Sequence, residues 1–131
     1  MAYTGVAVTD PVFDTCFANQ QIGYSLAAES SVTQATSKST AVTANTSNIQ
    51  ITMNNAALAA GAIVSFTLNN SLLSARDVLI VNVAGGIATA GTYTAYVSTI
   101  TTGSAVISLY NVSGGSLSEA VKLNLAIIHG Q

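Results

Sequence analysis

The chain has 131 residues, which is enough for one domain with a hydrophobic core and too few for two ordinary ones. Half of its residues are hydrophobic and only 6% are charged, against roughly 25% in a typical soluble domain. Three basic residues and a net charge of −2 exclude the set of Lys and Arg contacts that holds a phosphate backbone, so we expect no nucleic-acid partner. A surface so poor in charge has little repulsion to keep copies apart, which favours a subunit whose surface is covered by neighbours.

Residues 1–30 differ from the rest of the chain. They hold the only proline, the only cysteine, two of the three phenylalanines and three of the five acidic residues, and they show no sustained period of 2 or 3.6. The sequence therefore predicts an extended N-terminal arm with aromatic anchors, in which "FANQQIGYSLAAES" forms at most a short helical piece. The alternative, that this segment packs on its own domain, is equally open.

The same segment carries two further expectations. The start, "MAYTGVAVTDP", lacks the basic and compact apolar stretches of a signal peptide, so we expect synthesis in a cytoplasm without a cleaved export signal. Cys16 has no partner for an intrachain disulfide and is predicted to be a buried small hydrophobe.

From residue 31 onward apolar and polar residues alternate with period 2. The segments "NIQITM" and "AIVSFTLNN" each place apolar side chains on one face, and the alanine-rich stretch between them, 54–62, is too short for a stable helix. We expect it to cross from one sheet to the other, with Leu58 closing the open end between the sheets. "DVLIVNVAGG" is apolar on both faces, which is typical of a central strand covered on both sides.

The last third of the chain holds three more strands. "GTYTAYVSTITTGSAVISLYNVSGG" indicates two strands joined at Thr102 and Gly103, and "AVKLNLAII" a final one. Seven to eight short strands at this spacing predict an all-β antiparallel β-sandwich over residues 31–131, of the jelly-roll or immunoglobulin-like type. Alternation predicts these core residues: Ile49, Ile51, Val64, Phe66, Leu68, Ile80, Ile107, Leu109, Leu123, Leu125 and Ile127.

Residues that could carry chemistry are few. The sole histidine, His129, would need a carboxylate such as Asp77 or Glu119 beside it to form a Ser-His-Asp site, and we interpret it instead as a strand-end or interface residue. Zinc sites need several His or Cys ligands, and one of each is present. We therefore expect no enzymatic activity, no catalytic or metal-binding residues, and no cofactor.

A sugar-binding platform is an alternative that depends on three tyrosines. Tyr93, Tyr96 and Tyr110 lie on adjacent predicted strands, where aromatic faces could stack on a carbohydrate. Alternation places Tyr93 and Tyr96 on opposite faces, so at most two of the three share a surface. Tyrosines in sandwich cores and subunit interfaces are more common than such platforms.

Residues 31–130 contain the pieces "SKST", "ITMNNAALAAG", "VSFTLNN" and "GSLSEAVKLNLAII". With these pieces, this part of the chain resembles a β-sandwich module found in structural proteins of tailed bacteriophages. The resemblance implies a non-enzymatic virion component: most simply a capsid decoration (cement) protein, and alternatively a tail-fibre or tail-tip protein that binds host carbohydrate. It implies a homotrimer as the oligomeric state, the major capsid protein as partner, and the virion as location after synthesis in the host bacterial cytoplasm.

The arm lies outside this resemblance and supplies the predicted interface. Val12, Phe13 and Phe17 have no periodic strand to share, and an exposed aromatic cluster would be a sticky patch, so we expect them to bury against another subunit or the shell. Tyr24 is the fourth residue of this predicted interface. No apolar run approaches the ~20 residues of a membrane span, and no membrane partner is expected.

Overall fold

The structure is a computed structural model that describes residues 12–130. Over this range the chain forms one short 3-10 helix and eight strands. The helix η1 spans Leu26–Ala28, and the strands are β1 (Glu29–Thr33), β2 (Val42–Thr43), β3 (Asn48–Thr52), β4 (Ile63–Asn69), β5 (Val78–Gly85), β6 (Tyr93–Thr101), β7 (Ser104–Asn111) and β8 (Lys122–Ile128).

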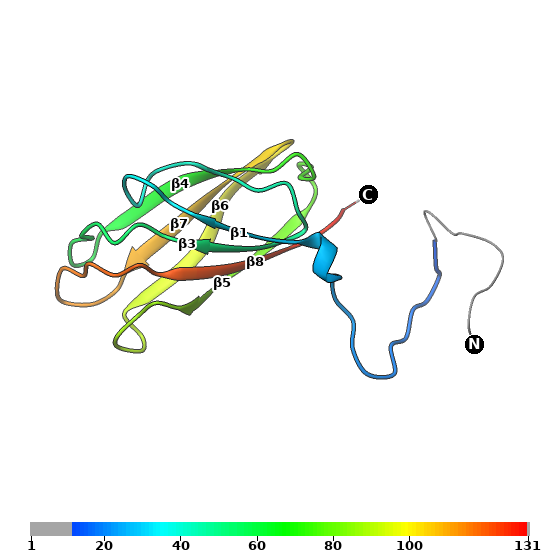
Figure 1. The fold of residues 1–131 in the computed structure, drawn as a ribbon, viewed down its shortest axis with the longest axis horizontal. Helices are drawn as coiled ribbons and strands as arrows, with labels where there is room; N and C mark the ends of the chain where they lie inside the picture. Colours follow the sequence, from blue (N-terminus) through cyan, green and yellow to red (C-terminus); the bar gives the residue numbers. More distant parts are fainter. Residues whose placement is uncertain (1–11, 131) are drawn as a thin grey trace.

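The eight strands form two four-stranded sheets that face each other around a shared core, as Figure 1 shows. The first sheet has the order β1-β3-β8-β5 and the second the order β2-β4-β7-β6. The chain passes to the opposite sheet at every connection between these strands except the β6–β7 hairpin. The predicted all-β fold with two packed sheets is confirmed.

The antiparallel pairing that the sequence predicted is only partly correct. β1 runs parallel to β3, and β2 runs parallel to β4, so each sheet is mixed; the remaining pairs are antiparallel. Parallel neighbours need a crossover between them, and here that crossover is a strand in the other sheet. Alternation within a strand fixes its faces but carries no information on its neighbour's direction.

The core follows the predicted alternation in most strands. Buried side chains from both sheets form one cluster, to which β3 contributes Ile49 and Ile51, β4 contributes Phe66 and Leu68, and β7 contributes Ile107 and Leu109. From β8 come Leu123, Leu125 and Ile127, and Val64 packs against the cluster as a half-buried residue. At roughly 25 cal/mol per Å² of apolar area removed from water, this shared layer is what holds the sheets together.

Ile80 is the exception, and the prediction for its strand was wrong. β5 lies at the edge of its sheet, and Leu79, Val81 and Val83 point inward while Ile80 is 48% exposed on the outer face. The described chain covers only one face of β5, so its second apolar face is left at the surface.

The connections match the predicted turns. Leu58 is buried between the sheets and pairs through its backbone with Leu117, which confirms that the alanine-rich stretch crosses between sheets and closes the open end. The β6–β7 turn contains Gly103 at φ +84°, a conformation that side chains with a Cβ rarely adopt. Gly86 also has a positive φ and approaches the Ala120 carbonyl so closely that a Cβ there would clash.

Candidate interaction surface

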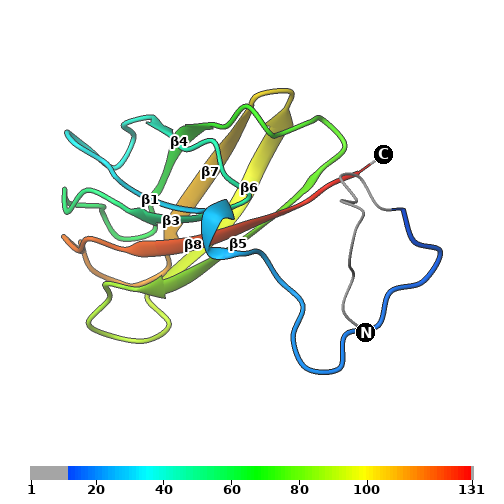
Figure 2. The same cartoon turned by 45° about the vertical axis from the view of Figure 1, so that its right-hand side comes forward.

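The arm is the first part of the candidate surface. Residues 12–25 form no helix or strand and run away from the two sheets, as the two views in Figures 1 and 2 agree. Val12 and Phe13 are exposed, and Phe17 is 91% exposed. Three of the four predicted interface residues therefore present apolar side chains to solvent. Residues 1–11 of the predicted arm lie outside the described residues.

Cys16 belongs to the same exposed stretch. The sequence predicted a buried small hydrophobe, and that prediction was wrong: Cys16 is a free, exposed thiol. The expectation came from the residue type alone, and a segment with no strand to share gives its side chains no core to enter.

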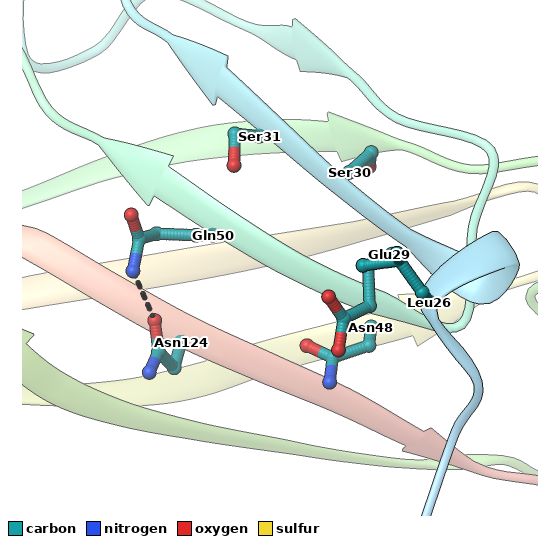
Figure 3. A pocket seen from close by; sticks show the side chains of 7 residues that line it. All are labelled: Leu26, Glu29, Ser30, Ser31, Asn48, Gln50 and Asn124. Atoms are coloured by element: carbon teal, nitrogen blue, oxygen red, sulfur yellow. Dashed lines mark hydrogen bonds between the residues drawn. The ribbon is translucent and has the colours of Figure 1, made fainter.

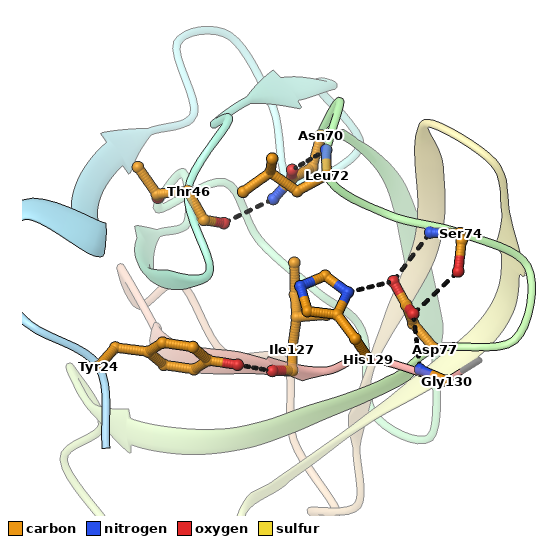
Figure 4. Close-up of polar contacts among 9 residues, drawn as sticks. All are labelled: Tyr24, Thr46, Asn70, Leu72, Ser74, Asp77, Ile127, His129 and Gly130. Atoms are coloured by element: carbon orange, nitrogen blue, oxygen red, sulfur yellow. Dashed lines mark hydrogen bonds and ion pairs between the residues drawn. The ribbon is translucent and has the colours of Figure 1, made fainter. Parts of the chain in front are cut away.

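Tyr24, the fourth predicted residue, anchors the arm to the first sheet. Its hydroxyl donates a hydrogen bond to the Ile127 carbonyl at the end of β8, as Figure 4 shows. The side chain is 39% exposed, so its ring is partly covered while the residues before it are not. The described arm is thus fixed at its C-terminal end and exposed along the rest.

An apolar groove begins where Tyr24 meets the sheet. Its volume is about 520 Å³, and its floor is the outer face of β5 and β8, where Ile80 pairs with Ala126. The lining residues are uncharged: Ile22, Gly23, Tyr24, Asn48, Ile80, Ala126 and Ile128. Val78, opposite Ile128 in the register, extends the exposed apolar surface beyond the groove.

A polar groove of about 540 Å³ continues along the same outer face towards β1. Figure 3 shows its lining: Leu26, Glu29, Ser30, Ser31, Asn48, Gln50 and Asn124. The Gln50 amide donates to Asn124 Oδ1 across β3 and β8 at 3.0 Å. Asn48 lines both grooves, so the sheet offers one continuous surface that is apolar at one end and hydrogen-bonding at the other.

The structure also places His129 beside Asp77, one of the two carboxylates that the sequence suggested for it. His129 Nδ1 lies 3.1 Å from Asp77 Oδ2, and the half-exposed imidazole follows the end of β8 (Figure 4). The hydroxyl of Ser74 donates to Asp77 Oδ1 at 2.9 Å rather than to the imidazole. The arrangement lacks the serine-to-histidine contact of a nucleophilic triad.

Asp77 instead ties the end of the chain to the loop before β5. Its side chain is fully buried and accepts from the backbone N–H of Ser74 at 2.8 Å and of Gly130 at 3.0 Å. The Ser74 N–H bond, with that of Gly130, lowers the pKa of Asp77 to about 2 against the opposing effect of burial. Gly130 passes so close to the Arg76 carbonyl that a Cβ would clash, which requires glycine there.

Glu119 lies at the opposite end of the fold, beside a buried lysine. Lys38 Nζ donates to the backbone carbonyls of Asn54 and Glu119, and burial lowers the pKa of Lys38 against the opposing charge of Glu119. Burial, together with the nearby Glu119 carboxylate, raises the pKa of Tyr93 to about 12. Although that carboxylate is close enough to act on Tyr93, neither the Tyr93 hydroxyl nor Glu119 Oε2 has a hydrogen-bond partner in residues 12–130.

The three tyrosines lie on the two faces of the second sheet, as the alternation of side chains along a strand requires. Tyr93 is buried between the sheets, whereas Tyr96 and Tyr110 point outward from β6 and β7 on diagonal positions of the register. On the same outer face the Ser108 hydroxyl lies 2.8 Å from Ser65 Oγ and 2.6 Å from Ser98 Oγ. The second sheet thus carries two aromatic rings beside a row of hydroxyls.

Sequence reasoning located the arm but missed the apolar groove. The signal was present: residues 78–83 are apolar on both faces, and Ile128 falls out of phase with the inward residues of β8. Both features indicate a second apolar surface, which we assigned to burial within one chain.

Within residues 12–130 no group of three or more His, Cys, Asp or Glu side chains could hold a metal ion. No helix in that range is long and apolar enough to cross a membrane. Comparisons of the chain with protein-family models, with curated proteins and with solved structures found no match.

Proposed function

We propose that this protein is a structural component of a tailed-bacteriophage virion, and specifically a decoration (cement) protein that binds the assembled capsid and stabilises it. The observation that supports the binding role is the apolar arm, in which Phe17 is 91% exposed and is left uncovered by the rest of residues 12–130. The virion setting comes from the resemblance of residues 31–130 to phage structural modules. The proposed partners are further copies of the chain, as a trimer, and the major capsid protein.

The composition suits such a subunit. A protein with only 6% charged residues loses little solvation free energy when its surface is covered, and it repels neighbouring copies weakly. Exposed apolar side chains on an otherwise neutral protein mark contact sites. Such a chain is better suited to repeated contacts in an assembly than to remaining a monomer in solution.

Stabilisation of a shell would follow from mass action. A protein that binds the assembled shell and not its free subunits shifts the equilibrium towards the shell, by RT ln(1 + [L]/Kd) at each site. Three linked copies around one axis bind more tightly than one, because the second and third contacts are intramolecular. An arm that becomes ordered on binding loses conformational entropy at that moment but covers a wide surface. Neither catalysis nor a cofactor has a part in this function.

For the finer fold type we favour a jelly-roll relative over an immunoglobulin-like domain. Eight strands in two four-stranded sheets are the jelly-roll number, whereas a constant-type immunoglobulin domain has seven. The chain also has no tryptophan and one cysteine, so it lacks the tryptophan and the disulfide of antibody domains. The two parallel pairs distinguish it from a purely antiparallel jelly roll.

The direct test is to locate the protein in intact particles. Gold-labelled antibodies against the two-sheet domain, viewed by electron microscopy, should decorate the head of the virion at many regularly spaced sites. Recombinant protein should also sediment with heads that lack tails. Label at the tail tip would favour the alternative below, and particles without label would contradict a virion role.

The second candidate function is a tail-fibre or tail-tip protein that binds host carbohydrate. It is favoured by Tyr96 and Tyr110, which share the outer face of the second sheet with a row of hydroxyls, since aromatic rings stack on sugars while hydroxyls bond to them. Binding of host glycans that is lost in Tyr96→Ala, and retained in Thr33→Ala on the other sheet, would support it.

A further inference from the structure

We propose that the arm of one copy binds in the apolar groove of a second copy, with Phe17 as the inserted side chain. The acceptor is the groove on the outer face of β5 and β8, and the donor is the exposed segment of residues 12–21. The inference rests on the self-association contained in the proposed function, but not on the virion role.

The groove is an unfilled apolar site. Ile80 and Ile128 stand out from its floor, and each is about half exposed. The chain's own arm forms only one wall: Gly23 and Tyr24 line the groove, and Ile22, which lines it as well, is still 84% exposed. A cavity of about 520 Å³ with this lining has room for an aromatic side chain and offers it no charge to desolvate.

The arm carries the matching side chains. Phe13 and Phe17 are exposed, and Asp14 is the only charged residue between positions 12 and 28. Burying a phenylalanine side chain favours association because it removes apolar surface from water. Because the groove is uncharged and the donor segment has one charged residue, no charge repulsion opposes their contact.

The course of the arm favours a second copy as the acceptor. The arm is held at Tyr24 by its bond to the Ile127 carbonyl, and upstream of this point it runs away from its own sheets (Figures 1 and 2). Phe17 would have to reverse direction around Ile22 and Gly23 to reach its own groove. Residues 12–25, when extended, reach on the order of 45 Å, which is enough to extend across a neighbouring molecule of this size.

The geometry also limits the assembly that results. Each copy has one donor segment and one acceptor groove, so exchange gives a reciprocal dimer, a closed ring or an open chain. A ring of three is the form that agrees with the proposed trimer. When every copy gives the same segment to a neighbour, the contact forms between surfaces that each copy already has.

The single cysteine makes this contact testable by disulfide trapping. Cys16 precedes Phe17 and is exposed, and Ala126→Cys places a second thiol on the groove floor. Wild-type protein is mixed with a Cys16→Ser/Ala126→Cys chain that carries a mass tag, and the mixture is oxidised with copper phenanthroline and run on a non-reducing gel. A matched control replaces Ala126→Cys by Thr67→Cys, on the outer face of the other sheet.

The proposal predicts a covalent heterodimer with the Ala126→Cys partner and only background with the Thr67→Cys partner. Ile80→Asp, introduced into the tagged chain, should reduce the heterodimer to that background, and circular dichroism should show that every variant is folded. Equal yields with both partners, or none with either, would overturn the proposal. So would a chain with Cys16 and Ala126→Cys together that oxidises within itself and stays monomeric, since its arm would then occupy its own groove.

These outcomes are separate from those that decide the virion role. Trapping uses purified protein with no particles present, so its failure leaves the labelling of virions unaffected. Conversely, a trapped heterodimer would support self-association even if virions carried no label. The virion role would then be contradicted while the contact between arm and groove would stand.

Discussion

Single side chains in the core set most of the stability of this protein. Phe66 is 2% exposed between the sheets, and Phe66→Ala should lower the free energy of unfolding by about 3–5 kcal/mol because it removes a large buried ring and leaves a cavity. Ile63→Ala, at an exposed position on the same strand, is the matched control and should cost far less. Urea unfolding of both variants measures the difference, and similar costs would mean that the faces of β4 are misassigned.

Asp77 should give the protein a specific sensitivity to acid. Its folded pKa of about 2 lies below the ordinary value of 3.8, so its stabilising contribution is fully present above about pH 4 and is lost as the pH falls towards 2. Asp77→Asn places an amide against the backbone N–H donors of Ser74 and Gly130, so this variant should be less stable at pH 7.

The measurement is the free energy of unfolding of both proteins between pH 7 and pH 2. The gap between wild type and Asp77→Asn should stay constant down to about pH 4 and then narrow. Two curves that remain parallel over the whole range would show that the ionised carboxylate of Asp77 contributes no stability.

At the scale of elements, the loops at one end are held together by a buried cation. Lys38, on the β1–β2 connection, donates to carbonyls on the β3–β4 and β7–β8 connections. Lys38→Met keeps the length of the side chain but leaves those two carbonyls without their donor, at about 1–3 kcal/mol for each unsatisfied group.

Lys122→Met, at an exposed position on β8, is the control and should be nearly neutral. Guanidinium unfolding compares the two variants. If Lys38→Met were as stable as Lys122→Met, the hydrogen bonds of Lys38 would contribute nothing and its burial would be incidental.

How well the strands could be predicted depends on what the alternation of apolar and polar residues indicates. It placed the inward faces of β3, β4, β7 and β8, because a strand with one buried face has one apolar side. It could not place β5, since apolar residues on both faces fit equally a central strand and an edge strand with a second contact surface. The parallel pairs were missed because strand direction depends on connections across the whole fold.

The candidate site was predictable to the same partial extent. The absence of any period over residues 1–30 pointed to an arm, and the structure finds Val12, Phe13 and Phe17 exposed. The groove could not be predicted, because it forms only when Ile80 of β5 and Ala126 of β8 become neighbours in the sheet. Residues 46 positions apart give no local signal of their contact.

At the scale of the whole molecule, the sandwich should fold without the arm. Residues 12–23 contribute no side chain to the core, and Tyr24 contributes one hydrogen bond to the Ile127 carbonyl. Deletion of residues 1–25 should therefore leave the far-UV circular dichroism spectrum and the cooperative unfolding transition in place, with a loss of roughly 0.5–1.5 kcal/mol for that bond. An unfolded truncated chain would mean that the arm belongs to the core.

The central claim is that this protein acts by self-association through its arm, and sedimentation velocity tests it most directly. We predict that the full chain sediments as a trimer over the micromolar range, and that the chain lacking residues 1–25, compared at the same concentrations, sediments as a folded monomer. A full chain that stays monomeric at high concentration, or a truncated chain that still sediments as the same oligomer, would contradict the account.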